Sequence, residues 1–541
     1  MDINMLKRVL AAVSFLAALV AAAPAAAQET AADNSAYILT PKAPDTPRIN
    51  GARIYGARPG ADFLFRIPVT GLRPMSFSAT GLPRGLKLDR DTGIITGKAR
   101  KAGTYHVKLR ARNSFGEDER ELRIVIGDRI ALTPPMGWNS WNCWGPKVSQ
   151  EKVLSSARAL VEKGLADYGW SYINTDDGWQ AQRGGEYNAI QPNRKFPDMK
   201  DMVDEIHSMG LKAGIYSGPW FGTFAGFIGS GCDNTEGKYK WQEDGFHDED
   251  FRFSDPDGKL KGSSRYYHVE YSFAGKDARQ WADWGFDYLK YDWNPIDYWH
   301  IRDIHDALAA TGRDFVLSLS NSAKVSMGPG IMEYAQCWRT TADIVDTWKS
   351  ISKIGFEGQD MWAGYKRPGN WPDADMLVVG KVGWGHPKPT RLTPNEQYTH
   401  ISLWALLSSP MLIGCDLADM DEFTVSLLCN NEVIDVNQDP LGFQAACVEG
   451  DEDYRIYVKP LEDGTLAVGL FNLSDTPREI GFVGKMLGVL GEQTIRDLWR
   501  QRDIATVPYK ERWETEVPSH GVVLVRVSPG ATYERPMGNN R

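Results

Sequence analysis

Residues 130–442 alternate between short apolar runs typical of strands and longer runs with the period of amphipathic helices. The strand candidates are 136–141, 172–175, 212–216, 287–291, 314–319, 337–341, the residues leading to Asp373, and 410–413. The helical candidates between them are 151–162, 199–208, 277–284, 303–310 and 395–406. Eight such units within about 300 residues predict a (β/α)8 TIM barrel rather than a doubly wound sheet.

The segments on either side of this region predict β-structure. Residues 38–127 alternate apolar and polar residues at 62–69, 104–111 and 121–126, with turn signals between these runs. Short strands with regular turns predict a small β-sandwich there. Residues 443–530 predict a second, antiparallel β-sandwich of structural role, with a hairpin at 455–471 and a closing strand at 520–527.

The connection between the third and fourth predicted strands spans residues 217–285. Most connections in compact domains have only about 4–6 residues, and much longer ones are usually functional. Its aromatic residues are Trp220, Phe221, Phe224, Phe227 and Trp241. This composition predicts either a cap over a site or a simple insertion.

The amino-terminal residues have the pattern of a secretory signal peptide. Lys7 and Arg8 precede an apolar run over 9–22, and Ala25-Ala26-Ala27 follows before Gln28. The alternative is a membrane anchor, but the apolar run is shorter than the ~20 residues needed to span a bilayer. We therefore expect residues 1–27 to be removed. The mature protein would be periplasmic or extracellular and would have no integral membrane segment.

Charge and cysteine content narrow the function classes. The formal net charge is −9, and removal of residues 1–27 makes it −10, whereas nucleic-acid binding calls for a basic face. Six cysteines in 541 residues are too few for a disulfide framework, although export would permit disulfides. No CxxC pair or His/Cys cluster has metal-ligand spacing. We expect no metal, no cofactor and no nucleic-acid partner.

Two aspartates carry the strongest chemical signal. Asp292 ends Tyr-Leu-Lys-Tyr-Asp and Asp343 follows Trp-Arg-Thr-Thr-Ala, so each has a cation nearby, Lys290 at i−2 and Arg339 at i−4. A retaining glycosidase needs one carboxylate to attack the anomeric carbon and a second carboxyl group to protonate the departing oxygen. Structural ion pairs would give the same local pattern, so both explanations stay open on these residues alone.

Other polar and aromatic residues fall at the carboxyl ends of predicted strands, where barrel enzymes hold their functional groups. Adjacent Asp176 and Asp177 cannot both face inward in a strand, so we expect them in the next turn, bound to neighbouring sugar hydroxyls. Tyr216 ends the third strand, and Asp375 lies near the seventh. Trp141 offers a flat floor for a sugar ring. Taken one at a time, the Asp-Asp pair could be a plain turn and the tryptophan a core residue. The recurrence of such residues at one end of the barrel predicts a binding site.

The motifs Pro-Pro-Met-Gly-Trp-Asn-Ser-Trp, Asp-Asp-Gly-Trp, Tyr-Leu-Lys-Tyr-Asp and Asp-Met-Leu follow one another along the chain. In this order they resemble the α-galactosidase and α-N-acetylgalactosaminidase group, glycoside hydrolase family 27, over residues 130–530. The resemblance implies Asp292 as nucleophile and Asp343 as acid/base. It also implies sugar contacts from Trp141, Asp176, Asp177, Tyr216, Lys290 and Arg339. Residues 81–97 resemble the immunoglobulin-like module often attached to bacterial glycosidases.

The chain departs from this family at two places. The positions of a disulfide that members often carry beside the nucleophile correspond to Phe224 and Asn294, so the resemblance implies that this bond is absent. A glutamate after the fifth strand commonly contacts the sugar 2-hydroxyl in α-galactosidases, and Ser320 takes its place here. A serine would leave room for a 2-acetamido group, which leaves the identity of the sugar open.

These observations predict a retaining exo-α-galactosidase acting on galactoside oligosaccharides or polysaccharides. An α-N-acetylgalactosaminidase or a β-L-arabinopyranosidase is an alternative on the same site. A non-catalytic carbohydrate-binding protein is disfavoured because both candidate catalytic aspartates are present. A metal-dependent hydrolase is disfavoured because the ligand pattern is missing. The sequence makes no prediction of the oligomeric state.

Overall fold

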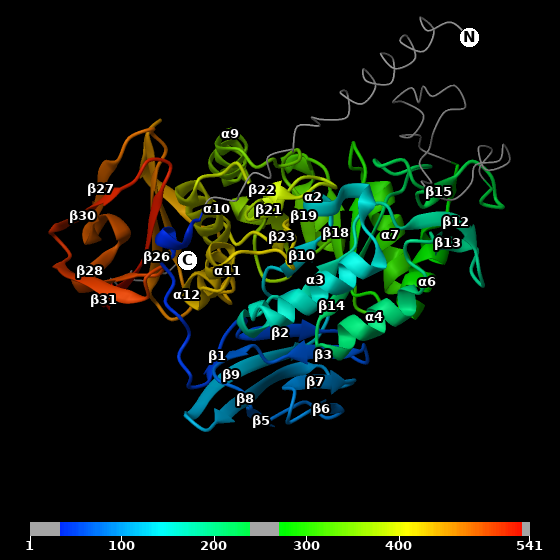
Figure 1. Ribbon diagram of the computed structural model, residues 1–541, viewed down its shortest axis with the longest axis horizontal. Coiled ribbons are helices and arrows are strands. Elements are labelled where there is room, and N and C mark those ends of the chain that lie inside the picture. Colours follow the sequence, from blue (N-terminus) through cyan, green and yellow to red (C-terminus); the bar gives the residue numbers. More distant parts are fainter. Residues whose placement is uncertain (1–32, 239–269, 533–541) are drawn as a thin grey trace, which may run out of the picture. The chain divides into compact units, whose positions relative to one another are not determined.

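The computed structural model describes residues 33–238 and 270–532. Its central feature is a sheet of eight strands in which every neighbouring pair is parallel (Figure 1). The order along the sheet is β20, β19, β18, β17, β14, β11, β10 and β23. A parallel bridge between Leu377 and Ile413 joins its two ends. This sheet confirms the predicted barrel.

All eight strands occur where the sequence predicted them, with small differences at their ends. They are β10 (Met136–Asn139), β11 (Tyr172–Asn174), β14 (Lys212–Ser217), β17 (Tyr288–Asp292), β18 (Val316–Ser320), β19 (Cys337–Arg339), β20 (Trp371–Asp373) and β23 (Met411–Ile413). Nearly all of their residues are buried, as expected for parallel strands covered on both faces.

The five predicted helices are also present. They are α3 (Gln150–Glu162), α4 (Met199–Ser208), α6 (Ala274–Trp284), α7 (Tyr298–Ala309) and α10 (Pro394–Leu406), and several can be followed in Figure 1. Helix α7 begins earlier than predicted because Asp297 caps it: the carboxylate accepts the backbone N–H of His300 at 3.0 Å. Only a short connection therefore separates Asp292 from the amino terminus of α7.

Several shorter elements were not predicted, because they are too short to show a helical or strand period. The helices are α2 (Trp141–Trp144), α8 (Gly328–Tyr334), α9 (Trp348–Ser352), α11 (Glu422–Leu428) and α12 (Asn431–Asn437). Single 3-10 or π turns cover Gly145–Lys147, Leu165–Tyr168, Val325–Met327, Lys353–Glu357 and Asp360–Tyr365. Two-stranded pairs are β12 (Gln180–Gly184) with β13 (Ala189–Pro192), β15 (Gly231–Cys232) with β16 (Tyr271–Ser272), and β21 (Lys381–Val382) with β22 (Lys388–Pro389).

A buried ion pair fixes the β12–β13 hairpin to α6. Arg183 Nη1 lies 2.6 Å from Asp277 Oδ1, and the two side chains are 1% and 0% exposed. The same carboxylate accepts the backbone N–H of Ile190 at 3.0 Å. Both charges are out of water, and their pairing compensates part of the cost of burying them.

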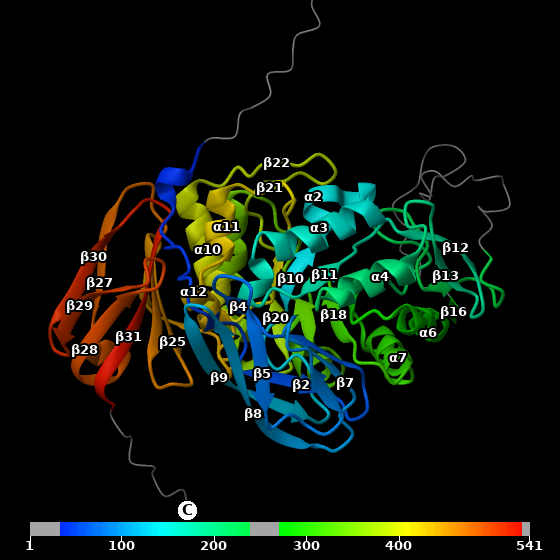
Figure 2. The same cartoon turned by 60° about the horizontal axis from the view of Figure 1, so that its bottom comes forward.

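The amino-terminal module is a small β-sandwich, as predicted (Figure 2). One sheet has the order β2 (Ile54–Ala57), β9 (Gly116–Ile126), β8 (Gly103–Asn113) and β5 (Ser76–Thr80); the other has β3 (Phe63–Arg66), β7 (Ile94–Gly97) and β6 (Leu86–Leu88). β1 (Arg48–Ile49) pairs with β4 (Val69–Thr70). Inward residues such as Phe63, Phe77 and Ile124 form its core.

The carboxyl-terminal module is antiparallel. Its larger sheet has the order β24 (Ala446–Gly450), β25 (Tyr454–Pro460), β26 (Leu466–Asn472), β31 (Val522–Thr532), β28 (Val489–Asp497) and β29 (Arg502–Pro508). β27 (Arg478–Val483) pairs with β30 (Arg512–Val517), and Gly484–Leu487 is a 3-10 turn. β25 and β26 form the predicted hairpin, and Ile456, Val468 and Phe482 belong to a core of their own.

Two sequence predictions fall outside the described residues: the signal peptide at 1–27, and Trp241 in the long third connection. Across the two described stretches, no helix combines the length and the apolar character needed to cross a membrane.

Candidate active site

The carboxyl ends of the barrel strands surround a cavity of about 90 Å³. Its lining residues are Trp141, Asn142, Asp176, Asp177, Tyr216, Phe224, Lys290, Asp292, Asn321, Arg339, Asp343, Ile344, Asp375, Met376 and Trp384. Of the site residues that the sequence predicted, all but Ser320 belong to this set. Residues from seven different strand ends therefore meet at one place, as the barrel topology requires.

Asp292, the predicted nucleophile, is the last residue of β17 and is 8% exposed. The Tyr216 hydroxyl donates to its Oδ2 at 2.9 Å, and the Asn321 amide donates to its Oδ1. Burial raises the pKa of Asp292 to about 6, while the positive charge of Lys290 and the Tyr216 hydrogen bond favour the charged form. The carboxylate is thus oriented by two donors and largely ionised at neutral pH.

Lys290 forms its ion pair with Asp176 rather than with Asp292. Its Nζ lies 2.9 Å from Asp176 Oδ2, which also accepts from Asn139 Nδ2 at 2.8 Å. The sequence pattern had associated Lys290 with Asp292. Two residues along one strand are about 6.6 Å apart, so a carboxylate following a nearby strand is the better partner. Burial lowers the pKa of Lys290, but Asp176 and Asp292 outweigh it and raise the pKa overall.

Asp176 and Asp177 lie in the turn after β11, as predicted, and each is 1% exposed. Asp177 accepts hydrogen bonds from Thr223 Oγ1 and from the backbone N–H of Ala225, both at 2.8 Å. Burial raises the pKa of Asp177 to about 7, partly offset by these two hydrogen bonds. The first part of the long connection after β14 therefore reaches the site and holds one of its carboxyl groups.

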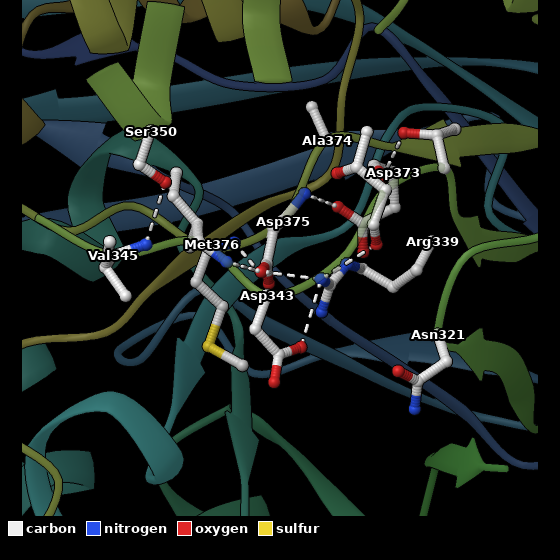
Figure 3. Close-up of polar contacts among 12 residues, drawn as sticks. Asn321, Arg339, Asp343, Val345, Ser350, Asp373, Ala374, Asp375 and Met376 are labelled. Carbon is white, nitrogen blue, oxygen red and sulfur yellow. Dashed lines mark hydrogen bonds and ion pairs between the residues drawn. The ribbon is translucent and has the colours of Figure 1, made fainter. Parts of the chain in front are cut away.

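Arg339, at the end of β19, lies between two carboxylates (Figure 3). Its Nη2 is 2.7 Å from Asp375 Oδ2 and 3.2 Å from Asp343 Oδ1. The side chains of Arg339 and Asp375 are nearly fully buried, whereas that of Asp343 is 73% exposed. Asp375 has a φ of 80° and also accepts from the backbone N–H groups of Ile344 and Met376, at 2.7 and 2.9 Å. A fixed, buried pair thus lies behind an exposed carboxyl group.

The prediction for Ser320 was wrong in position. Ser320 is buried in β18, in register with Asp292, and does not line the cavity. The next residue, Asn321, does, and it contacts the Asp292 carboxylate. Asn321 has a φ of 71°, a left-handed conformation that asparagine tolerates better than most residues. The chain turns sharply there, which brings the longer amide side chain to the cavity in place of the short serine.

The apolar part of the lining was only partly foreseen. Trp141 was predicted, but Phe224, Met376 and Trp384 were not assigned to the site. Phe224 lies in the aromatic-rich connection that the sequence marked as a cap or an insertion. Trp384, with a φ of 48°, lies in Gly383-Trp384-Gly385. A tryptophan between two glycines is a local signal of an unusual turn that could have identified it.

This arrangement gives two carboxyl groups in unlike surroundings. Asp292 is buried and accepts two hydrogen bonds, whereas Asp343 faces the opening beside Arg339. Pairs of carboxyl groups in different environments are how glycosidases separate the nucleophile from the proton donor. Within the described ranges, no three His, Cys, Asp or Glu residues are grouped so that they could hold a metal ion.

Family models match most of the chain. The model of alpha galactosidase A matches residues 133–262 and 256–439. The model of the alpha galactosidase C-terminal beta sandwich domain matches residues 451–527, and an Ig domain model matches residues 19–127.

Comparison with individual proteins and solved structures gives the same family. Alpha-galactosidase 2 of Arabidopsis thaliana is 34% identical over 400 residues, which cover 72% of this chain and 88% of that protein. A Bacteroides fragilis structure solved as a candidate alpha-galactosidase/melibiase has a TM-score of 0.77 at 32% identity, covering 89% of this chain and 98% of the other. A GH27 β-L-arabinopyranosidase of Geobacillus stearothermophilus has a TM-score of 0.64 at 29% identity, covering 75% and 98%. The chain belongs to the alpha-galactosidase family, glycoside hydrolase family 27.

Proposed function

We propose that Asp292 is the nucleophile and Asp343 the acid/base of this retaining α-galactosidase. The observation that carries the assignment is the difference between their surroundings. Asp292 is buried and accepts hydrogen bonds from Tyr216 and Asn321, which hold an ionised carboxylate in one orientation. Asp343 is exposed at the cavity mouth, where a leaving group departs and water arrives, and Arg339 holds it from behind.

The reaction then has two steps. An Asp292 oxygen bonds to the anomeric carbon as the bond to the leaving oxygen breaks, and Asp343 donates its proton to that oxygen. In the second step Asp343, now a carboxylate, takes a proton from a water molecule. The oxygen of that water displaces Asp292 from the anomeric carbon. Two inversions restore the α configuration in the product.

The remaining polar lining suits a single neutral sugar. Asp176 and Lys290 on one side, and Arg339 with Asp375 on the other, supply fixed acceptors and donors for hydroxyl groups. We assign galactose as this sugar. Because Asn321 rather than Ser320 borders the cavity, the argument for extra room at the sugar 2-position loses its basis. This makes the α-N-acetylgalactosaminide alternative weaker than the sequence alone made it.

A panel of nitrophenyl glycosides with a metal chelator present tests the sugar. We expect kcat/KM for the α-galactoside to exceed that for the α-glucoside by at least about tenfold, or 1.4 kcal/mol, because unmatched buried carboxylates discriminate against the wrong hydroxyl orientation. Preference for the glucoside would contradict the galactose assignment. Preference for β-L-arabinopyranoside or α-N-acetylgalactosaminide would keep the mechanism and change the substrate.

We further propose that the chain is exported and acts on galactosides in the periplasm or the medium. The basic, apolar and small-residue order of residues 1–27 supports this. Expression in a bacterial host and amino-terminal sequencing of the purified protein test it. The expected first residue is Gln28. A protein that starts at Met1 and stays in the cytoplasm would contradict it.

A further inference from the structure

A hollow of about 640 Å³ lies on the outward face of α7, beside α8. Its lining residues are Tyr298, Trp299, Arg302, Asp303, Asp306, Gly330, Glu333 and Tyr334. None of these lines the catalytic cavity. Helix α7 turns its other face, with Ile301 and Ile304, into the barrel. The hollow is thus a separate surface feature with two exposed aromatic side chains, Trp299 at 60% and Tyr298 at 45% exposure.

Both exposed rings are held in place. The Tyr298 ring lies directly over Gly330, where an added Cβ would come within 2.3 Å of the ring, and its hydroxyl donates to the Met327 carbonyl at 3.2 Å. The Trp299 ring packs edge-on against His300, with ring centres 4.6 Å apart. His300 Nδ1 is in turn 2.6 Å from an Asp297 carboxylate oxygen. Rigid aromatic side chains lose little entropy on binding and make good platforms for a ligand.

The charged residues of the hollow indicate which class of ligand it can bind. One cation, Arg302, stands among three carboxylates, Asp303, Asp306 and Glu333. Excess negative charge repels anions and would also oppose pairing with a second copy of the same face. Side chains of this kind can instead form hydrogen bonds with neutral hydroxyl groups while the aromatic faces cover sugar rings. The surface therefore fits an uncharged carbohydrate chain.

We propose that this hollow binds the backbone of a neutral polysaccharide that carries terminal α-galactosyl groups. The inference rests on the α-galactosidase activity of the chain. Helix α7 follows β17, so its aromatic first turn lies at the same end of the barrel as Asp292 and the cavity. Binding of a polymer there raises the local concentration of its galactosyl groups near the cavity without changing the chemistry.

The test compares a polymer with a small substrate. For Trp299→Ala, kcat/KM on galactomannan, whose mannan backbone carries single α-galactosyl groups, should fall by about 5- to 10-fold, or 1.0–1.4 kcal/mol. Hydrolysis of nitrophenyl α-galactoside should stay unchanged. Trp299→Phe should retain most of the polymer activity. Phe115→Ala removes a comparably exposed aromatic, 53% exposed in the β8–β9 turn, and should change neither substrate.

Binding is measured separately from turnover. In the inactive Asp292→Asn background, galactomannan or unbranched mannan in a native gel should retard the protein, and Trp299→Ala should abolish most of that retardation. Equal retardation of both proteins, or an equal loss on both substrates in kinetics, would overturn the proposal. So would a dimer by light scattering that Trp299→Ala dissociates. Failure to hydrolyse nitrophenyl α-galactoside would instead count against the activity itself.

Discussion

Removing the Tyr216 hydroxyl should shift the pH dependence of the enzyme in a predictable direction. In the structure this hydroxyl donates to Asp292 Oδ2 at 2.9 Å, and the pKa of Asp292 is raised by burial to about 6. Tyr216→Phe keeps the ring but deletes a hydrogen bond that favours the charged carboxylate. The pKa of Asp292 must then rise further, so the nucleophile becomes protonated at a higher pH.

The size of the shift follows from the strength of the bond. A hydrogen bond to a charged group contributes about 1.5–3 kcal/mol, and one pKa unit corresponds to about 1.36 kcal/mol. The pKa of Asp292 should therefore rise by about 1 to 2 units, since the Asn321 donor remains. At pH 6 about half of the wild-type carboxylate is ionised, against roughly 1–10% in the variant. The loss of activity should thus be about 5- to 50-fold there and should shrink as the pH rises.

The measurement is kcat/KM for nitrophenyl α-galactoside between pH 5 and 8, expressed as the ratio of variant to wild type. This ratio removes any titration that the two proteins share. Tyr457→Phe is the control, because that buried hydroxyl in β25 has no hydrogen-bond partner among the described residues, and its ratio should be flat. A ratio for Tyr216→Phe that does not change with pH would refute the argument that this hydroxyl stabilises the charged nucleophile.

Three further predictions concern named carboxylates. Asp292→Ala should nearly abolish turnover, and azide should restore part of it by forming the β-galactosyl azide, which NMR identifies; near-native turnover would exclude Asp292 as nucleophile. Asp343→Ala should slow hydrolysis of substrates with poor leaving groups by about 10²- to 10⁴-fold and nitrophenyl substrates much less; equal losses on both would argue against its acid role. Asp277→Ala removes a buried carboxylate that lies 2.6 Å from Arg183 Nη1 and should lower the free energy of unfolding by about 3–5 kcal/mol in denaturant melts, and a loss below ~1 kcal/mol would contradict a stabilising role for this ion pair.

The sequence alone predicted the barrel and most of the residues that line the cavity, and one physical reason explains both. The strands can be recognised in the sequence as runs of apolar residues because each strand is buried on both sides. Once eight parallel strands close, their carboxyl ends must converge, so polar residues that follow them must meet. Asp176, Asp292 and Asp343 are far apart in the chain, and the order of the strands alone assigns them to one cavity.

The residues that the sequence missed are those placed by backbone conformation outside the strands. Asn321 and Trp384 both have positive φ values, 71° and 48°, and such turns depend on tertiary packing rather than on a repeat in the sequence. Phe224 reaches the cavity on a connection whose path no local pattern defines. The ion pair between Lys290 and Asp176 was likewise not predicted, because Lys290 lies in one strand and Asp176 follows another, and no pattern within a single strand indicates their contact.

Burial raises the pKa values of two carboxyl groups of the cavity, Asp177 and Asp292, and the negative charge of Asp176 raises both further. Five carboxyl groups and only two cations, Lys290 and Arg339, line it. Burial makes the excess negative charge costly, and the pKa values of Asp177 and Asp292 rise to about 7 and about 6. Between these values most Asp292 is ionised while much of Asp177 keeps its proton. Bonding of Asp292 to the anomeric carbon then removes one negative charge from the cavity, so the repulsion that disfavours the free carboxylate is relieved in the covalent intermediate.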